Sequence, residues 1–264
     1  MLTRRAFVGV GAAGACAAGF AKVGTARGLP AARYFLLESY LLKNGSQALR
    51  LSNYMRTRIG LAQQLQIVPP SFVLEALIAA HMPQVLLVSA FDSPEGMAAM
   101  QRKLRQDASA RDAMAAWEAG DEPPYEELNE TVLEAAEYCP PLPAAVVAGS
   151  TKPPRVFELR TYHSPTERQL KALHERFEGT EIKIFERSGI HPVLYSSTLY
   201  GANKPNLTYL IPFDDLAARE KAWTAFGADA EWVKVRADSI AKHGQISSVI
   251  QMSLFKAAAY SPVR

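Results

Sequence analysis

The stretch VFELRTYHSPTERQLKALHERFE, residues 156–178, begins with the pattern of a β-strand and continues with the pattern of a helix. Side chains of a strand point alternately to its two faces. Each face carries three residues: Phe157, Leu159 and Thr161 on one, and Glu158, Arg160 and Tyr162 on the other. We expect the first face to pack against helices and the second face to point away from them.

The helix after this strand is predicted from its start, its apolar spacing and its end. Ser164 is the expected cap, with Pro165 in the first turn and Glu167 completing a capping box. Ser188-Gly189 is the expected end, because glycine often follows the last helical turn. The apolar stripe between start and end consists of Leu170, Leu173, Phe177 and Ile184.

Two further strands, a second helical region and a last strand complete this half of the chain. Residues 191–201 and 206–213 have strand patterns and are joined by turn residues 201–205. Asp214 is expected to open the second helical region, and residues 244–255 form the last strand. The order β-α-β-β-α-β predicts a four-stranded antiparallel sheet with both helices on one face, the ferredoxin-like arrangement.

The same pattern recurs earlier in the chain at a constant offset. RYFLLESY from Arg33 aligns with RVFELRTY from Arg155, 122 residues later. This offset also aligns PQVLLVSAFDS from Pro83 with PNLTYLIPFDD from Pro205. We therefore predict two diverged copies of one module, at 33–138 and 155–258. The segment between them, 139–154, contains five prolines and is predicted to be a linker.

The predicted fold class is α+β, with two tandem ferredoxin-like modules and antiparallel sheets. Helices cover only one face of each sheet, so the other face needs a partner. Two such sheets meet face to face or close into a barrel, with a cavity between them. Whether both sheets come from one chain or from two protomers of a homo-oligomer is left open by the sequence.

The strand and helix of residues 156–178, together with IPFDDLAAREKAW and ADAEW downstream, resemble the NIPSNAP family. This family is a branch of the dimeric α/β-barrel superfamily. The resemblance covers the second copy and implies the fold described above. The first copy departs from it: its strand reads FLLESY, and Asp107-Ala108-Ser109-Ala110 lacks the tryptophan found at Trp232. The resemblance implies little chemistry, because the family is better known for organelle and vesicle association. Superfamily relatives include cofactor-free monooxygenases and haem enzymes.

The candidate ligand-binding residues are those expected to point into the cavity between the sheets. In the second copy these are Glu158, Arg160 and Tyr162, a charged pair with a hydroxyl donor beside it. In the first copy they are Glu38 and Tyr40. Arg160, Tyr162 and His163 are also the candidates for catalysis, with a histidine at the strand end as the candidate acid or base. The alternative is a structural ion pair, since paired buried charges often have no other role.

No cofactor or metal is expected from local motifs. None of the five histidines is spaced from another histidine or a cysteine as metal ligands are, and the chain has no P-loop, GxSxG or CxxC motif. Gly9, Gly11 and Gly14 match the dinucleotide-binding GxGxxG, but too few residues precede them to form its strand. Trp223, Phe226 and Trp232 are expected to pack against the sheet.

The first 26 residues are predicted to be a twin-arginine signal peptide. Arg4 and Arg5 precede a short apolar run that ends at Ala21, too short to be a permanent membrane span. Cleavage is expected near Ala26, which places the protein in the periplasm or outside the cell. Lipidation at Cys16 is an alternative that the sequence leaves open.

Cleavage there also changes the charge and the cysteine content. The signal segment carries the whole net charge of +3, so 26 basic and 26 acidic residues remain. Without a basic excess, nucleic acid is an unexpected partner. Only Cys139 remains, so no internal disulfide can form, and we expect it to be a packed, unreactive residue.

Three functions fit these observations. The first is an exported module that binds a small ligand or a protein partner through its cavity. The second is a cofactor-independent enzyme of the monooxygenase or isomerase type. The third is a structural partner whose sheet face is consumed by homo-oligomerisation.

Overall fold

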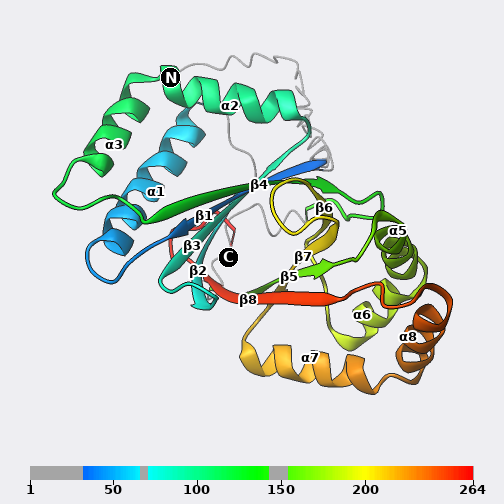
Figure 1. Cartoon of the computed structure of the whole chain (residues 1–264). Coiled ribbons are helices and arrows are strands. Elements are labelled where there is room, and N and C mark those ends of the chain that lie inside the picture. Colours follow the sequence, from blue (N-terminus) through cyan, green and yellow to red (C-terminus); the bar gives the residue numbers. More distant parts are fainter. Residues whose placement is uncertain (1–31, 66–70, 143–153, 264) are drawn as a thin grey trace, which may run out of the picture.

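The computed structural model describes residues 32–65, 71–142 and 154–263, which form a closed barrel of eight antiparallel strands (Figure 1). The predicted signal segment 1–26 and residues 143–153 of the predicted linker lie outside the described residues. One chain supplies the whole barrel, so both predicted sheets meet within a single molecule.

The first half contributes four strands and three helices. They are β1 (Tyr34–Leu41), α1 (Gln47–Gln64), β2 (Ser71–Ile78), β3 (Gln84–Phe91), α2 (Pro94–Gln106), α3 (Ala108–Glu118) and β4 (Glu127–Ala135).

The second half repeats this order, with the first helix divided. It contains β5 (Val156–His163), α5 (Glu167–Arg176), the π-helical turn η1 (Phe177–Glu181), α6 (Ile182–Ser188), β6 (Leu194–Tyr200), β7 (Asn206–Phe213), α7 (Leu216–Ala228), α8 (Ala230–His243) and β8 (Val249–Ala257). β1 and β5, β3 and β7, β4 and β8, α2 and α7, and α3 and α8 each begin 122 residues apart.

The strand order around the barrel is β1-β3-β2-β8-β5-β7-β6-β4. Each half therefore contributes four neighbouring strands, with its first and third strands at the centre, as the ferredoxin-like prediction requires. The halves are joined where β2 pairs with β8 and where β4 pairs with β6. The predicted α+β fold with antiparallel sheets is confirmed.

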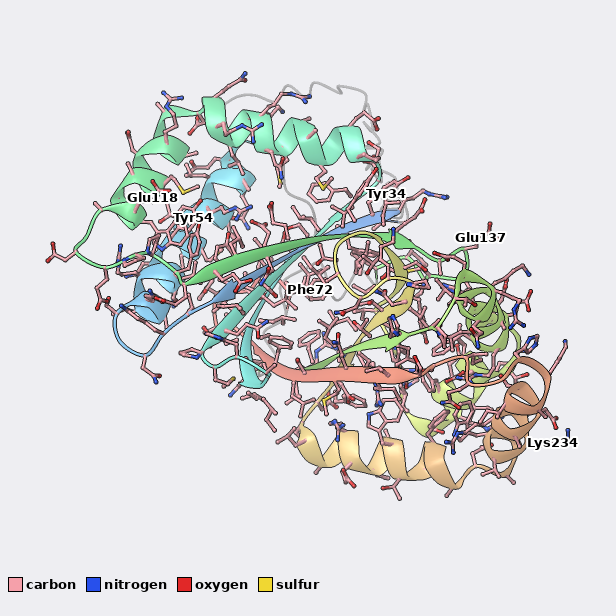
Figure 2. All side chains as sticks on the ribbon, viewed as in Figure 1. Tyr34, Tyr54, Phe72, Glu118, Glu137 and Lys234 are labelled. Carbon is pink, nitrogen blue, oxygen red and sulfur yellow. The ribbon has the colours of Figure 1, made fainter. Side chains whose placement is uncertain are left out.

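Helices lie outside the barrel in two groups, α1 to α3 on one side and α5 to α8 on the other (Figure 1). Large apolar side chains fill the barrel, including Phe72, which Figure 2 labels at its centre. The other members of this core include Phe35, Phe157, Leu210 and Phe255. Among the described helices, none is both long and apolar enough to cross a membrane.

Several predicted boundaries shift by one or a few residues. Thr166 rather than Ser164 caps α5. Its hydroxyl accepts a hydrogen bond from the backbone N–H of Gln169 at 3.3 Å. Ser164 instead donates to the Ile246 carbonyl at 2.7 Å, because the β5 end packs against the segment before β8. Asp215, one residue after the predicted position, caps α7. β8 begins at Val249 rather than at residue 244. The helix end at Gly189, in the left-handed conformation, is as predicted.

Candidate functional site

The two faces of β5 are oriented opposite to the prediction. Phe157 and Leu159 belong to the barrel core, whereas Tyr162 belongs to the cluster beneath the helices of the second half. Glu158 accepts hydrogen bonds from α7, so it too faces the helices. The prediction that Glu158, Arg160 and Tyr162 point into a cavity between the sheets is therefore wrong. The helix-facing side carries the charges because the helices supply their partners.

Glu158 is the centre of a buried ionic network. Its side chain is fully buried and accepts from Arg160 Nη1 at 3.0 Å, from Arg219 Nε at 2.7 Å and from Trp223 Nε1 at 2.8 Å. The Arg160 guanidinium also lies 4.2 Å from the Trp223 ring centre. A buried carboxylate that accepts this many hydrogen bonds has the geometry of a structural ion pair, the alternative that the sequence left open.

Arg219 and Trp223 were not predicted from the sequence as partners of Glu158. They are four residues apart on α7, so both project from one side of the helix toward the sheet. The four-residue spacing is visible in the sequence. The contact with Glu158 is not, because 61 and 65 residues separate it from Arg219 and Trp223.

A cavity between the sheets does exist, at one end of the barrel, but it is small. Its volume is about 150 Å³, below the roughly 300 Å³ of the smallest pockets for drug-sized ligands. Its lining is mostly hydroxyl and amide side chains, among them Ser39, Asn129, Thr161, Thr198, Asn206 and Thr208. None of the predicted ligand-binding residues lines it.

A much larger pocket lies in the first half, between the sheet and the helices. It has a volume of about 720 Å³ and is lined by residues of β1, β4 and all three first-half helices. Glu38 and Tyr40, predicted as ligand-binding residues, both line it, although it is not the cavity for which they were predicted. Figure 2 shows Tyr54 of α1 and Glu118 of α3, which line the same pocket.

Glu38 forms the polar floor of this first-half pocket. Its two carboxylate oxygens each accept a hydrogen bond of 2.9 Å from the Arg58 guanidinium, which reaches down from α1. The Tyr40 hydroxyl donates to the same carboxylate at 3.1 Å. Burial, followed by the Glu38 charge, raises the pKa of Tyr40 far above its usual range, so its hydroxyl stays protonated.

Aromatic rings form one wall of the pocket. Trp117 of α3 stacks on Tyr54, with ring centres 4.4 Å apart and planes 4° from parallel. Tyr40 and Tyr125 surround it with ring centres at 6.0 and 5.6 Å. Trp117 is buried, and its Nε1 has no hydrogen-bond partner among the described residues. An unpaired buried donor costs about 1–3 kcal/mol, and this one belongs to a side chain that lines the pocket.

The corresponding space in the second half is closed by aromatic side chains. Positions 122 residues after Gln101, Leu104 and Ala110 hold Trp223, Phe226 and Trp232. These rings pack on one another and in the helix-side core, as predicted from the sequence. The remaining cavity there has a volume of only about 100 Å³. The half with the smaller side chains at these positions is thus the half with the much larger pocket.

His163, His174 and Cys139 each have hydrogen-bond partners nearby. His163 lies at the exposed end of β5 and contacts Ser248 Oγ at 3.4 Å. His174 is held between the Tyr138 hydroxyl and Ser197, both at 2.8 Å, and burial lowers its pKa. Burial also raises the pKa of the Cys139 thiol, which favours its less nucleophilic protonated form. Within the described residues no cluster of three metal-ligating side chains occurs.

The second half, with its β-α-β-β-α-β order and the helix caps at Asp215 and Asp229, corresponds to a known family. Residues 157–262 match the NIPSNAP family model. The predicted resemblance is thereby confirmed for the second half. The match does not extend to the first half, where the large pocket lies. None of the curated proteins matches the chain.

Solved structures share the fold at low sequence identity. A protein from Lactobacillus acidophilus provisionally assigned as a monooxygenase has a TM-score of 0.54 and 8% identity, covering 86% of this chain and 94% of its own. An anthrone oxidase-like protein has a TM-score of 0.53 and 10% identity, covering 87% and 92%. A NIPSNAP protein of unknown function from Agrobacterium tumefaciens is 19% identical, with a TM-score of 0.38, and covers 45% of this chain and 100% of its own.

Proposed function

We propose that the first-half pocket binds a flat aromatic molecule that carries a hydrogen-bond acceptor. The unpaired Trp117 Nε1 beside a cavity of about 720 Å³ carries this proposal. The cavity falls within the roughly 300–1,000 Å³ of small-molecule sites. The rings of Trp117, Tyr54 and Tyr125 offer faces and edges to a flat ligand, and the indole N–H selects for a carbonyl or similar oxygen.

Binding rather than turnover is the better supported of the two functions. Both oxygens of the Glu38 carboxylate accept hydrogen bonds from Arg58 or Tyr40, which hold the group in place as part of the pocket wall. The Tyr40 hydroxyl remains protonated because burial raises its pKa. These groups therefore fix the floor of the pocket and its polarity.

The Trp117→Phe variant tests the role of the indole donor. The unaltered protein should bind 9-fluorenone about fivefold more tightly than fluorene, which has the same rings without the carbonyl, because one neutral hydrogen bond contributes about 1 kcal/mol. In Trp117→Phe the ring remains but the donor is lost, so the two affinities should become equal. Equilibrium dialysis of both compounds measures this.

The Trp232→Phe variant is the matched control, because Trp232 belongs to the second half and does not line the first-half pocket. It should keep the preference for fluorenone. Equal binding of both compounds to the unaltered protein would refute the acceptor preference. Failure of both to bind, or unchanged preference in Trp117→Phe, would refute the site.

We also infer that the two halves diverged from one module and that the protein is exported by its twin-arginine segment. The constant spacing of 122 residues between corresponding elements supports the first inference.

Export predicts that Edman sequencing of protein from the cell envelope gives a new N-terminus near residue 27. Replacing Arg4 and Arg5 by lysine should leave the precursor uncleaved in the cytoplasm. An N-terminus at Met1 in the envelope fraction would contradict it.

A further inference from the structure

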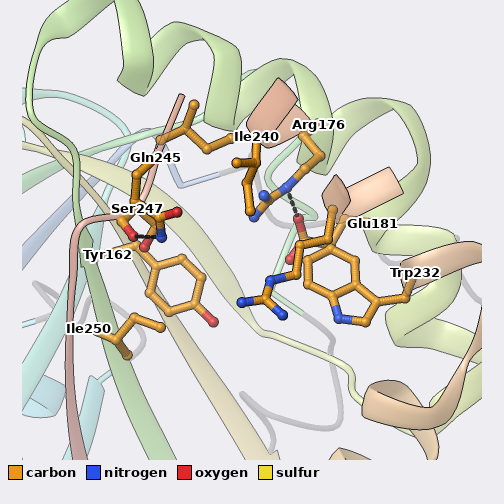
Figure 3. A pocket seen from close by; sticks show the side chains of 10 residues that line it. Tyr162, Arg176, Glu181, Trp232, Ile240, Gln245, Ser247 and Ile250 are labelled. Carbon is orange, nitrogen blue, oxygen red and sulfur yellow. Dashed lines mark hydrogen bonds and ion pairs between the residues drawn. The ribbon is translucent and has the colours of Figure 1, made fainter. Parts of the chain in front are cut away.

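The small cavity of the second half combines a largely apolar lining with a few charged and polar side chains, among them Arg176, Glu181 and Arg236. It occupies about 100 Å³ between β5, β8, α8 and the π-helical turn η1. Figure 3 shows Tyr162, Arg176 and Glu181 around it. Tyr162 and Ile250 lie 122 residues after Tyr40 and Leu128, which line the first-half pocket, so the two cavities occupy corresponding places.

Two buried charges face each other at this cavity. Arg176 Nε donates to Glu181 Oε2 at 2.7 Å, and the two side chains are 10% and 1% exposed. Glu181 is the last residue of η1, a π-helical turn of the kind that is frequent at functional sites.

Positive charge exceeds negative charge in this layer of the second half. Arg160 and Arg219 share the buried carboxylate of Glu158, and Arg219 also lies 3.7 Å from the exposed Glu220. Arg176 pairs with the other buried carboxylate, Glu181. Arg236 of α8 also lines the cavity, and in the described part of the chain it has no carboxylate partner. Cations placed together without enough carboxylates attract an anion.

Hydroxyl groups complete the lining. Ser247 Oγ is buried without a hydrogen-bond partner among the described residues, and Tyr162 presents its ring and hydroxyl to the cavity (Figure 3). With about 30 Å³ per water molecule, the cavity has the volume of roughly three waters, which matches a small oxyanion rather than a multi-ring compound.

We propose that this cavity binds a small monovalent carboxylate of the size of acetate. Arg236 and Arg176 would bind its two oxygens, with Ser247 as a further donor. The site is independent of the proposed aromatic ligand, because it lies in the other half and shares no lining residue with the first-half pocket.

Glu181 competes with the bound carboxylate for Arg176. Burial raises the pKa of Glu181 to about 7, against the opposing effect of Arg176 and Arg160. The other titratable groups that interact with it are the tyrosines of the surrounding strands and the preceding loop: Tyr138, Tyr162, Tyr195 and Tyr209. Below pH 7 Glu181 becomes neutral and releases Arg176, so an anion binds more tightly there than above pH 7.

Calorimetric titration of the full chain with acetate tests this proposal. Acetate stays ionised between pH 6 and pH 8, so a change in affinity reports on the protein. We expect affinity about tenfold higher at pH 6 than at pH 8. Glu181→Gln removes the competing charge without changing the side-chain shape, and should give the tighter affinity at both pH values. Glu178→Gln, an exposed neighbour, should keep the pH dependence.

The Arg236→Gln variant separates this site from general anion attraction. Arg236 is exposed, so its loss should leave the fold intact, and acetate affinity should fall at least tenfold at pH 6. No measurable binding of acetate by the unaltered protein, or equal binding in Arg236→Gln, would overturn the proposal. Binding of 9-fluorenone should be unchanged in every one of these variants, so the two sites succeed or fail separately.

Discussion

The Glu158→Ala variant should lose about 3–5 kcal/mol of unfolding free energy. Glu158 is fully buried and accepts hydrogen bonds from Arg160, Arg219 and Trp223. Removing its carboxylate leaves two guanidinium groups and one indole N–H beneath α7 without their acceptor. Uncompensated buried charge is among the largest destabilising effects of a single substitution. Urea denaturation followed by tryptophan fluorescence measures the loss.

The exposed neighbour Glu220 provides the control for this variant. It lies 3.7 Å from Arg219, and its side chain is 76% exposed. Surface ion pairs contribute about 0–1 kcal/mol, so Glu220→Ala should change stability by no more than that. If both variants lost similar amounts, the network around Glu158 would not be a main source of stability in the second half.

The Ala110→Trp variant should abolish binding of 9-fluorenone in the first-half pocket, with a loss of affinity greater than about tenfold. Ala110 lines that pocket, and the corresponding position in the second half is Trp232. Both residues donate their backbone N–H to a capping aspartate, Asp107 or Asp229, at 2.9 and 3.0 Å. Because the backbone is held alike in the two halves, the larger side chain should be accommodated by filling the pocket.

Ala116→Trp is the matched control on the same helix. Ala116 is exposed and does not line the pocket, so a tryptophan there should leave binding unchanged. Circular dichroism should show folded protein for both variants. Retained binding in Ala110→Trp, with the protein folded, would mean that the ligand does not occupy this pocket.

The two halves use the same framework in different ways. At the central strand, Glu38 of the first half pairs with Arg58 of its helix. The corresponding residue of the second half, 122 positions later, is Arg160, so the charge on the strand is reversed. The helix layer of that half carries the buried carboxylate of Glu181. Aromatic residues fill the second half, whereas the first half keeps a large pocket with an unpaired donor. The same fold therefore accommodates opposite charges and side chains of very different size at corresponding positions.

The sequence by itself determined the elements and their order. Alternation placed a strand at 206–213, the bounds later found for β7, and glycine ended a helix at Gly189. These features are local, since strand period, caps and turn residues act over a few neighbours. The missing tryptophan at Ala110 was also visible in the sequence, but its consequence was not.

Only the tertiary structure decided which face of β5 the helices cover. Both faces carry residues that can be buried, and a charged residue such as Glu158 is buried stably only when distant residues supply its partners. Arg219 and Trp223, more than 60 residues away, do so, and that contact reverses the predicted orientation. The first-half pocket is likewise a property of packing, because the space left by a small side chain depends on every helix around it.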